Sequence, residues 1–307
     1  MQMKFKAHQS FFIRKGWLSK GLRAVSSPDK KAIFMPSNSR LAMDELGLGS
    51  NQVVALRYWL QVIGLIKCEN DRRNGHFVTG LGNLILKEDP YMEEAGTLWA
   101  LHCNLASSRD EATSWYFLFN EFNIGSFNKD AFTRALEHYV FTCGDKKEVA
   151  LASLDADFSC ILNTYIPHER INGKAASPES VIDCPLGELG LLDVESRADK
   201  TYRKIPANPR ALPPLIILYA ICSMREHLQK DGADLVDEMK LEVLLDGPYS
   251  PGKIFTLDSV GLLDKLYELE NANHLRITRT AGLDVVRLTN SNLGSLDCLE
   301  RYYKEIG

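Results

Sequence analysis

The sequence predicts a mainly α-helical protein with small β-hairpins, an α+β fold. Apolar residues recur at helical spacing through most of the chain, as at Val53, Leu56 and Leu60, which is the pattern of an amphipathic helix. Two stretches, residues 66–78 and 273–289, place short apolar runs around a polar turn that contains glycine, which is typical of hairpins. Helices are therefore expected to form the body of the fold, with a hairpin near each end of the chain.

Composition is typical of a soluble globular protein. Of the 307 residues, 45% are hydrophobic and 25% are charged, which allows a sizeable buried core. No apolar run reaches the ~18–20 residues of a membrane span, and the basic N-terminus lacks the apolar stretch of a signal peptide. The seven cysteines are scattered and never spaced as CxxC, which argues against disulfides or structural zinc. We therefore predict a cytoplasmic protein with no membrane partner.

Charge is distributed unevenly along the chain. The net charge is −4, yet residues 1–40 hold nine basic side chains and one acidic side chain, giving +8 and leaving −12 for residues 41–307. Phosphate binding needs a local positive potential and not a positive whole. A basic arm on an acidic body favours a DNA contact or docking onto an acidic partner, and a solvated charged face is the simpler alternative.

Residues 1–88 are predicted to form this basic arm followed by a winged helix-turn-helix. A helix within residues 40–47 ends at a turn that contains Gly47 and Gly49, and residues 51–66 form the next helix. Two short strands around a polar loop then form the wing. In this motif the second helix enters the major groove of DNA and the wing reaches the backbone. Binding to protein alone is the open alternative.

Several side chains of this unit suit contacts with DNA. Gln52, Arg57 and Gln61 lie off the apolar stripe of the second helix, where they would reach base edges. The side chains that we expect at phosphates are basic: Lys15, Lys20, Arg72, Arg73 and Lys253. The last of these follows Ser-Pro-Gly, which lacks the spacing of a P-loop, so no ATP site is predicted.

The middle of the chain divides into a helical part and an irregular part. Residues 89–166 are dense in aromatic residues at helical spacing, which predicts a helical middle domain with an aromatic core and not a base-stacking platform. Residues 167–210 contain five prolines and several glycines, which predicts a long irregular connection or an inserted β-rich segment.

Residues 211–307 are predicted to form a C-terminal helical domain. Helices are expected over residues 212–229, 234–245 and 257–271, and residues 273–289 alternate as a hairpin. Three helices and a hairpin favour a second winged-helix-like unit, and another kind of helical domain fits the pattern too.

The first residues carry a motif that resembles a known family. The segment FKAHQSFFIRKGWLSKGL, residues 5–22, resembles the N-terminal signature of the bacterial DUF4007 family. The matching positions are Phe5, His8, Phe11 or Phe12, Arg14, Gly16, Trp17, Leu18 and Lys20. The family's usual glycine before the histidine is Ala7 here, which puts a backbone role for that glycine in doubt.

Further segments resemble the same family in the same order, so that the resemblance covers nearly the whole chain. Besides LGLGSNQVVALRYWLQVIGLI, the second helix and the turn before it, the matching segments are DPYMEEAGTLWALH (89–102), FNEF (119–122), LDADFSCILNTYIP (154–167), DCPLGELGLL (183–192), SPGKIFTLD (250–258), TAGL (280–283) and RYY (301–303). None of them is a catalytic motif by itself, and the set is specific.

The family includes the SspB-type nickase component of single-strand DNA phosphorothioation defence systems. Such systems also use a cysteine desulfurase, an ATPase and a protein similar to phosphoadenosine-phosphosulfate (PAPS) reductases. The resemblance therefore implies a subunit of an anti-phage defence system that nicks double-stranded DNA, or a non-catalytic adaptor that recruits the sulfur-transfer machinery to it.

Candidate catalytic residues follow from the chemistry of phosphodiester cleavage together with this resemblance. Cleavage needs an activated water, charge stabilisation and usually a Mg²⁺ or Mn²⁺ ion held by carboxylates. His8 is the candidate base or ligand, Arg14 the candidate phosphate clamp, and Asp157 the candidate catalytic carboxylate. Asp157 and Asp183 are the candidate metal ligands, while Asp155 would point away from Asp157 on a helix. Structural roles for His8 and Asp183 are the alternatives.

Overall fold

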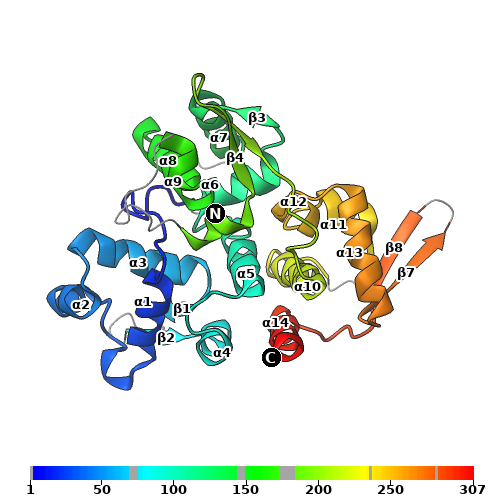
Figure 1. Ribbon diagram of the computed structural model, residues 1–307, viewed down its shortest axis with the longest axis horizontal. Helices are drawn as coiled ribbons and strands as arrows, with labels where there is room; N and C mark the ends of the chain where they lie inside the picture. Colours follow the sequence, from blue (N-terminus) through cyan, green and yellow to red (C-terminus); the bar gives the residue numbers. More distant parts are fainter. Residues whose placement is uncertain (1–2, 69–74, 144–148, 173–183, 235–236, 281–282) are drawn as a thin grey trace.

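The computed structural model describes residues 3–68, 75–143, 149–172, 184–234, 237–280 and 283–307. Over these residues helices predominate, and the strands form three small antiparallel sheets (Figure 1). The predicted α+β class is confirmed. Within the described residues no helix combines the length and the apolar character that a membrane span requires.

The N-terminal group contains a helix pair followed by a hairpin, in the predicted order. Helix α2 (Ser39–Leu46) ends at Gly47, whose φ of 59° is the left-handed conformation of a helix C-cap. Helix α3 (Ser50–Val62), the hairpin of β1 (Ile66–Cys68) and β2 (His76–Val78), and α4 (Gly80–Glu88) follow. The order of helix, turn, helix and hairpin is the predicted one, while the assignment as a winged helix-turn-helix and its DNA-reading role stay predictions.

A helix that the sequence analysis did not predict lies inside the basic arm. Helix α1 (Trp17–Ser26) buries Trp17, Leu22 and Val25 on one side, while Lys20 and Arg23 stay exposed on the other. It crosses α3 closely, because a Cβ atom added at Gly21 would lie 2.7 Å from Leu60 Cδ1. The basic arm is therefore partly a docked helix, which fixes its charges on the protein surface.

The middle group is built on aromatic residues, as predicted. Helix α5 (Ala95–Ala106) is buried on nearly every side and runs through the centre of the molecule (Figure 1). Around it lie α6 (Thr113–Tyr116), the π-helical turn η3 (Phe117–Glu121), α7 (Lys129–Thr142) and α8 (Leu151–Tyr165). Rings of Phe117, Phe122 and Phe132 meet at centroid distances of 5.4 to 5.6 Å, which stabilises this core.

The segment predicted as irregular contributes a hairpin to the middle group. After α9 (His168–Asn172), the 3₁₀ turn η4 (Pro185–Leu189) leads into β4 (Leu192–Ser196) and β5 (Thr201–Lys204). Strand β5 also pairs with β3 (Ser126–Phe127), so the sheet order is β3-β5-β4. Of the two predicted alternatives, the described part of the segment fits the β-containing insertion.

The C-terminal group repeats the helix and hairpin order. Helix α10 (Pro214–Lys230) precedes β6 (Glu238–Lys240), α11 (Leu241–Asp246), α12 (Pro251–Ile254) and α13 (Ser259–Asn271). The hairpin of β7 (Leu275–Thr280) and β8 (Leu283–Leu288) completes a sheet of order β6-β8-β7, and α14 (Ser295–Ile306) packs back on α10. Strand β6 lies where one long helix was predicted over residues 234–245.

A buried histidine joins the middle and C-terminal groups. His102 on α5 donates its Nε2–H to the carbonyl oxygen of Ile254 at 2.9 Å, and its Nδ1 accepts from the hydroxyl of Tyr165 at 2.8 Å. Burial lowers the pKa of His102 to about 4. This imidazole therefore serves as a neutral structural link between α5, α8 and α12.

Candidate nucleic-acid interface

Five basic side chains follow α1 and the loops at its ends; we call them the α1 basic strip. They border two neighbouring hollows that share Gly16, Ser19 and Tyr91, so the strip forms one continuous surface. Its members are Arg14, Lys15, Lys20, Arg23 and Lys30. Lys20 and Arg23 stand three residues apart, which places them on the same face of α1.

Fixed contacts orient the cations of the strip. Lys20 Nζ donates to the carbonyl oxygen of Leu46 at 2.5 Å, which holds the ammonium at the end of α2. Lys30 pairs with Glu45 at 2.6 Å, and the Lys15 ammonium lies 4.0 Å from Glu93. Two of the five cations thus have carboxylate partners. The strip keeps an excess of positive charge, which is the electrostatic requirement for phosphate binding.

An exposed aromatic side chain lies within the strip. Tyr91 is 64% exposed, and the Arg23 guanidinium lies 4.4 Å from the centre of its ring. Aromatic side chains among cations are the platforms on which unpaired bases stack, at about 1–3 kcal/mol per base.

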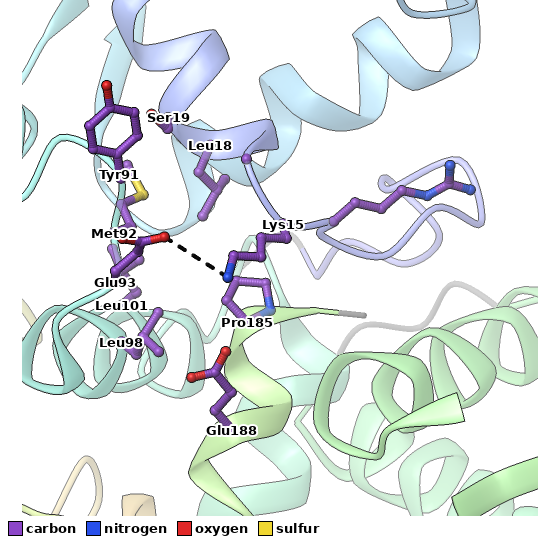
Figure 2. A pocket seen from close by; sticks show the side chains of 12 residues that line it. Lys15, Leu18, Ser19, Tyr91, Met92, Glu93, Leu98, Leu101, Pro185 and Glu188 are labelled. Carbon is purple, nitrogen blue, oxygen red and sulfur yellow. Dashed lines mark ion pairs between the residues drawn. The ribbon is translucent and has the colours of Figure 1, made fainter. Parts of the chain in front are cut away.

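The hollow at the start of α1 brings acidic and basic groups together (Figure 2). It encloses about 160 Å³ between the first turn of α1, the loop before α5, and η4. In Figure 2 the Lys15 ammonium lies between Glu93 on one wall and Glu188 on another, above Leu98 and Leu101. Two carboxylates and a lysine around one small space form a donor set suited to a phosphate and a divalent cation.

The first turn of α1 adds a positive end to this hollow. Leu18 and Ser19 line it, Gly16 precedes the helix with φ of 80° and makes no side-chain cap, and the first turn holds no acidic residue. Unpaired backbone N–H groups at a helix start favour anions. The helix end and Lys15 therefore act in the same direction on a bound phosphate.

The structure brings His8 and Asp157 together in the interior. His8 Nε2 lies 2.8 Å from Asp157 Oδ1, and both side chains are at most 2% exposed. The Ser10 N–H donates to His8 Nδ1 at 3.1 Å, so the proton sits on Nε2 and is donated to Asp157. The ring stacks on Trp59 at a centroid distance of 5.9 Å. No nitrogen lone pair of His8 is left for a substrate proton.

Asp157 is equally occupied by protein donors. Its Oδ1 also accepts from the Lys6 N–H at 2.7 Å, and its Oδ2 accepts from the Ser114 hydroxyl at 2.6 Å. The loop that it binds is strained, because Lys6, Gln9 and Ser10 have φ between 50° and 66°. As placed, the pair fastens this loop to α8 and offers no open surface for metal or substrate. Asp155 is partly exposed and pairs with Lys129 at 3.2 Å.

Arg14, the predicted phosphate clamp, lies at the edge of the hollow and is half-buried. Its guanidinium lies over the rings of Phe12 and Trp17, at 5.8 and 5.5 Å from their centres. Cation–π contacts of this kind hold a guanidinium while leaving its N–H groups free to donate. The structure therefore brings Arg14, Lys15 and Lys20 to one surface.

The side chains predicted on α3 lie elsewhere and differ in availability. Gln52 caps its own helix, because its Oε1 accepts from the Gly49 N–H at 3.0 Å. Arg57 donates to the carbonyl oxygen of Phe34 at 3.3 Å and borders a separate hollow. Gln61 is exposed on the surface of α3. Of these three, Gln61 is the side chain most open to a ligand.

The other predicted site residues are not part of this surface. Lys253 lies half-buried on α12 in the C-terminal group. Burial, and to a smaller extent the charge of Lys253, lower the pKa of Lys204 to about 8. Arg72, Arg73 and Asp183 lie outside the described residues.

A metal ion fits poorly at Asp157. Both oxygens of Asp157 already accept hydrogen bonds from protein groups. Within the described parts of the chain, no group of three or more His, Cys, Asp and Glu side chains has the geometry of a metal site. Mg²⁺ commonly takes one or two carboxylates and completes its shell with water and phosphate oxygens. Glu93 and Glu188 both line the hollow at the start of α1, which therefore offers two carboxylates.

Several residues of this surface were not singled out by sequence reasoning. Arg23 and Lys30 were counted only as charges, and Tyr91, Glu93 and Glu188 were not proposed for any role. A signal was present, since Tyr91 and Glu93 lie in DPYMEEAGTLWALH and Glu188 lies in DCPLGELGLL, two of the family-like segments. Only the folded chain shows that these segments border the same hollow as α1.

Comparison with known proteins gives a consistent result. The chain is similar to a magnesium-ion-bound crystal structure of SspB, with 28% identity and a TM-score of 0.84, covering 99% of this chain and 88% of that one. It is also similar to another crystal structure of SspB, with 26% identity, a TM-score of 0.83 and the same coverage. No curated protein matches the chain.

A family model adds the assignment by sequence. The model for proteins of unknown function named DUF4007 matches residues 5–303, from the His8 loop to the tyrosines of α14. The match includes both the α1 basic strip and the C-terminal sheet. The chain therefore belongs to the DUF4007 family and has the fold of SspB.

Proposed function

We propose that this protein is the SspB-type, DNA-binding component of a phosphorothioation system, and that the α1 basic strip holds the backbone of duplex DNA. The strip itself carries the proposal: five cations along one surface, with carboxylate partners for two of them. Phosphates attract such a surface without regard to sequence, and ordered cations position the duplex. The neighbouring helix α3 lacks acidic residues, so it does not repel DNA that approaches beside the strip.

The binding test uses charge reversal on the exposed face of α1. Lys20→Glu combined with Arg23→Glu should weaken binding of a fluorescent duplex on the order of 100-fold at low salt. The slope of log affinity against log salt concentration should become less steep, by the amount that about two phosphate contacts contribute. The control is Arg134→Glu with Lys200→Glu, two exposed cations of the middle group. Equal effects of the two double variants, or no duplex binding by the unmodified protein, would contradict the proposal.

Strand nicking is the activity that we propose for the hollow beside the strip. Lys15 and the first turn of α1 would hold a phosphate there, while Glu93 and Glu188 would hold a Mg²⁺ ion. The bound ion would supply Lewis-acid polarisation of the phosphate. The similarity to a magnesium-bound SspB structure favours this cation. In this arrangement His8 and Asp157 act indirectly, because they fasten the loop that leads into the strip.

Supercoiled plasmid with Mg²⁺ or Mn²⁺ separates nicking from simple binding. We expect the open-circle product from the unmodified protein and none from Glu93→Gln with Glu188→Gln, while duplex binding stays within about threefold. The matched control is Glu137→Gln with Glu242→Gln, two exposed glutamates on α7 and α11. Nicking that survives the first pair would move the chemistry away from this hollow.

The alternative function is a non-catalytic adaptor that brings the sulfur-transfer machinery to DNA. The exhaustive hydrogen bonding of Asp157 favours it, since the carboxylate first considered for catalysis has no free oxygen. Duplex binding through the strip with no open-circle product under either metal would establish the adaptor. Its partners would be the cysteine desulfurase, the ATPase and the PAPS-reductase-like protein. Co-purification with each of them is the measurement that tests this set.

A further inference from the structure

The outer face of the C-terminal sheet carries one exposed cation on each strand. In the order β6-β8-β7 these are Lys240, Arg287 and Arg276. Arg276 pairs in register with Arg287, and Lys240 pairs with Val285, two residues before Arg287 on β8. Because alternate residues of a strand share a face, all three side chains lie on the same side of the sheet. We call this surface the C-terminal basic face.

The opposite face of the same sheet is a packed interior. Leu275, Val286 and Leu288 are at most 4% exposed, and they alternate with the residues of the basic face. Arg279 belongs to that inner side, where it pairs with Asp284 at 3.2 Å and contacts the Tyr267 hydroxyl on α13. The inner side of the sheet is thus packed in the core, whereas the outer side is exposed.

The charges on the outer face are poorly compensated. Arg276 and Arg287 stand directly opposite each other, an arrangement of like charges that costs stability. Glu238 pairs in register with Arg287 on the same face and forms an ion pair with it at 3.6 Å, so one of the three cations is compensated. Among the described residues, Arg276 and Lys240 have no ion-pair partner. A bound anion would offset the repulsion between these cations that the fold leaves uncompensated.

The chemistry of this face fits phosphate better than a protein surface. None of the large hydrophobic side chains exposed on the described part of the molecule belongs to β6, β7 or β8. Protein interfaces usually have an apolar centre, whereas nucleic-acid interfaces are polar and positively charged. Helix α13 does not suit phosphate binding, because its exposed side includes Asp264 and Glu268. Its one basic residue, Lys265, is buried and pairs with Glu268 at 2.8 Å.

We propose that the C-terminal basic face is a second binding surface for the backbone of duplex DNA. The inference rests on the proposed function for its ligand and uses none of the residues of the α1 basic strip. In Figure 1 the β7–β8 hairpin projects from the end of the molecule opposite α1 and α2. The two surfaces therefore hold either separated parts of a long duplex or two duplexes, which keeps DNA bound while the hollow at α1 is engaged.

The test neutralises the two opposed arginines in the full-length protein. Arg276→Gln with Arg287→Gln should lower affinity for a long fluorescent duplex about tenfold and reduce the salt dependence of affinity by about two contacts. Arg276→Lys with Arg287→Lys keeps the charge and should bind within about threefold of the unmodified protein, since phosphate contacts need charge more than fork geometry. Arg134→Gln with Lys200→Gln is the control. Circular dichroism confirms that each variant is folded.

Each outcome bears on one of the two surfaces. Loss of affinity in Lys20→Glu with Arg23→Glu but not in the sheet variant overturns this inference and leaves the proposed function standing. Loss in the sheet variant alone supports the inference and contradicts the assignment of the α1 basic strip. Polyglutamate is a second probe: if the sheet variant loses affinity for polyglutamate and keeps it for the duplex, the face binds acidic protein and the inference is wrong. A protein without affinity for duplex DNA overturns both.

Discussion

The N-terminal and C-terminal groups share an order of elements but differ in the charge of the helix before the hairpin. Helix α3 contains no acidic residue, and its one charged side chain is Arg57. Helix α13 contains Asp264, Glu268 and Glu270 against the single Lys265. Since phosphate contact depends on local potential and not on the order of helices, the same arrangement can serve different roles. In the C-terminal group the positive charge lies on the sheet and not on the helix.

The two groups also differ in how they join the middle of the molecule. The N-terminal loop is fastened to α8 by a buried polar network centred on Asp157, which holds three non-glycine residues at positive φ. The C-terminal group is joined by the packing of α10 and α14 against α5 and by the link from His102 to α12. A strained loop held by polar contacts is more sensitive to a single substitution than a packed helix pair.

The largest effect is therefore expected at Asp157. Asp157→Ala leaves the Lys6 N–H, the His8 imidazole and the Ser114 hydroxyl without their acceptor in a buried site, which should lower the free energy of unfolding by about 3–5 kcal/mol. Urea denaturation followed by circular dichroism measures it. The control is Asp155→Ala, two residues away on the same helix but in a partly exposed surface ion pair, with an expected loss below about 1 kcal/mol. Similar losses for both would contradict a fastening role.

The second effect tests the joint of the C-terminal group through pH. Burial lowers the pKa of folded His102 to about 4 from its ordinary 6.5, so the unfolded chain binds the proton more readily. The stability due to neutral His102 is complete above pH 6.5 and is lost as the pH falls toward 4, by up to about 3 kcal/mol. Urea denaturation across this range should show a flatter dependence in His102→Gln. Parallel curves would exclude His102 as the titrating group.

Local patterns predicted the elements better than the surfaces. The periodicity of Val53, Leu56 and Leu60 gave α3, and glycine chemistry gave the turn at Gly47, because both depend on neighbouring residues. Helix α1 was not predicted, because its basic residues were considered only as charge. Strand β6 was not predicted either, since three residues of EMK have no strand period of their own and pair only with distant β8.

The candidate site was predictable only in part, for a related reason. The basic residues of the α1 basic strip all fall within residues 14–30, so their positive potential could be predicted. The contact of His8 with Asp157 spans 149 residues, and the resemblance indicated both residues without showing that they are buried. The hollow joins α1, the loop before α5 and η4, and no local spacing relates Lys15 to Glu188. Local charge can be predicted from the sequence, whereas the meeting of distant residues at one site depends on the fold.

The third prediction compares exposed tyrosines in the two groups. Tyr91→Ala should weaken binding of single-stranded DNA about tenfold, in line with about 1–3 kcal/mol for one stacked base. Tyr91→Phe should retain binding, because stacking needs the ring and not the hydroxyl. Tyr267→Ala on acidic α13 is the matched control and should change affinity less than twofold. Fluorescence anisotropy with a labelled single strand measures all three, and equal effects at the two tyrosines would contradict the assignment of Tyr91.

The smallest effect should come from reducing the charge difference between α3 and α13. Asp264 is exposed on α13 and has no ion-pair partner among the described residues. Asp264→Lys adds two units of positive charge to the helix that packs on the other side of the sheet, and should raise duplex affinity about two- to fivefold at low salt and hardly at all at high salt. Asp130→Lys, at an exposed position on α7, is the control.

The size of that increase depends on where DNA lies on the C-terminal group. If the duplex contacts only the outer face of the sheet, the lysine acts from a distance, and screening should remove its effect as the salt concentration rises. If the duplex reaches α13 itself, the substitution creates a direct phosphate contact, and the salt dependence of affinity should become steeper by about one contact. Measuring affinity at several salt concentrations therefore distinguishes contact through the sheet alone from contact that includes the helix.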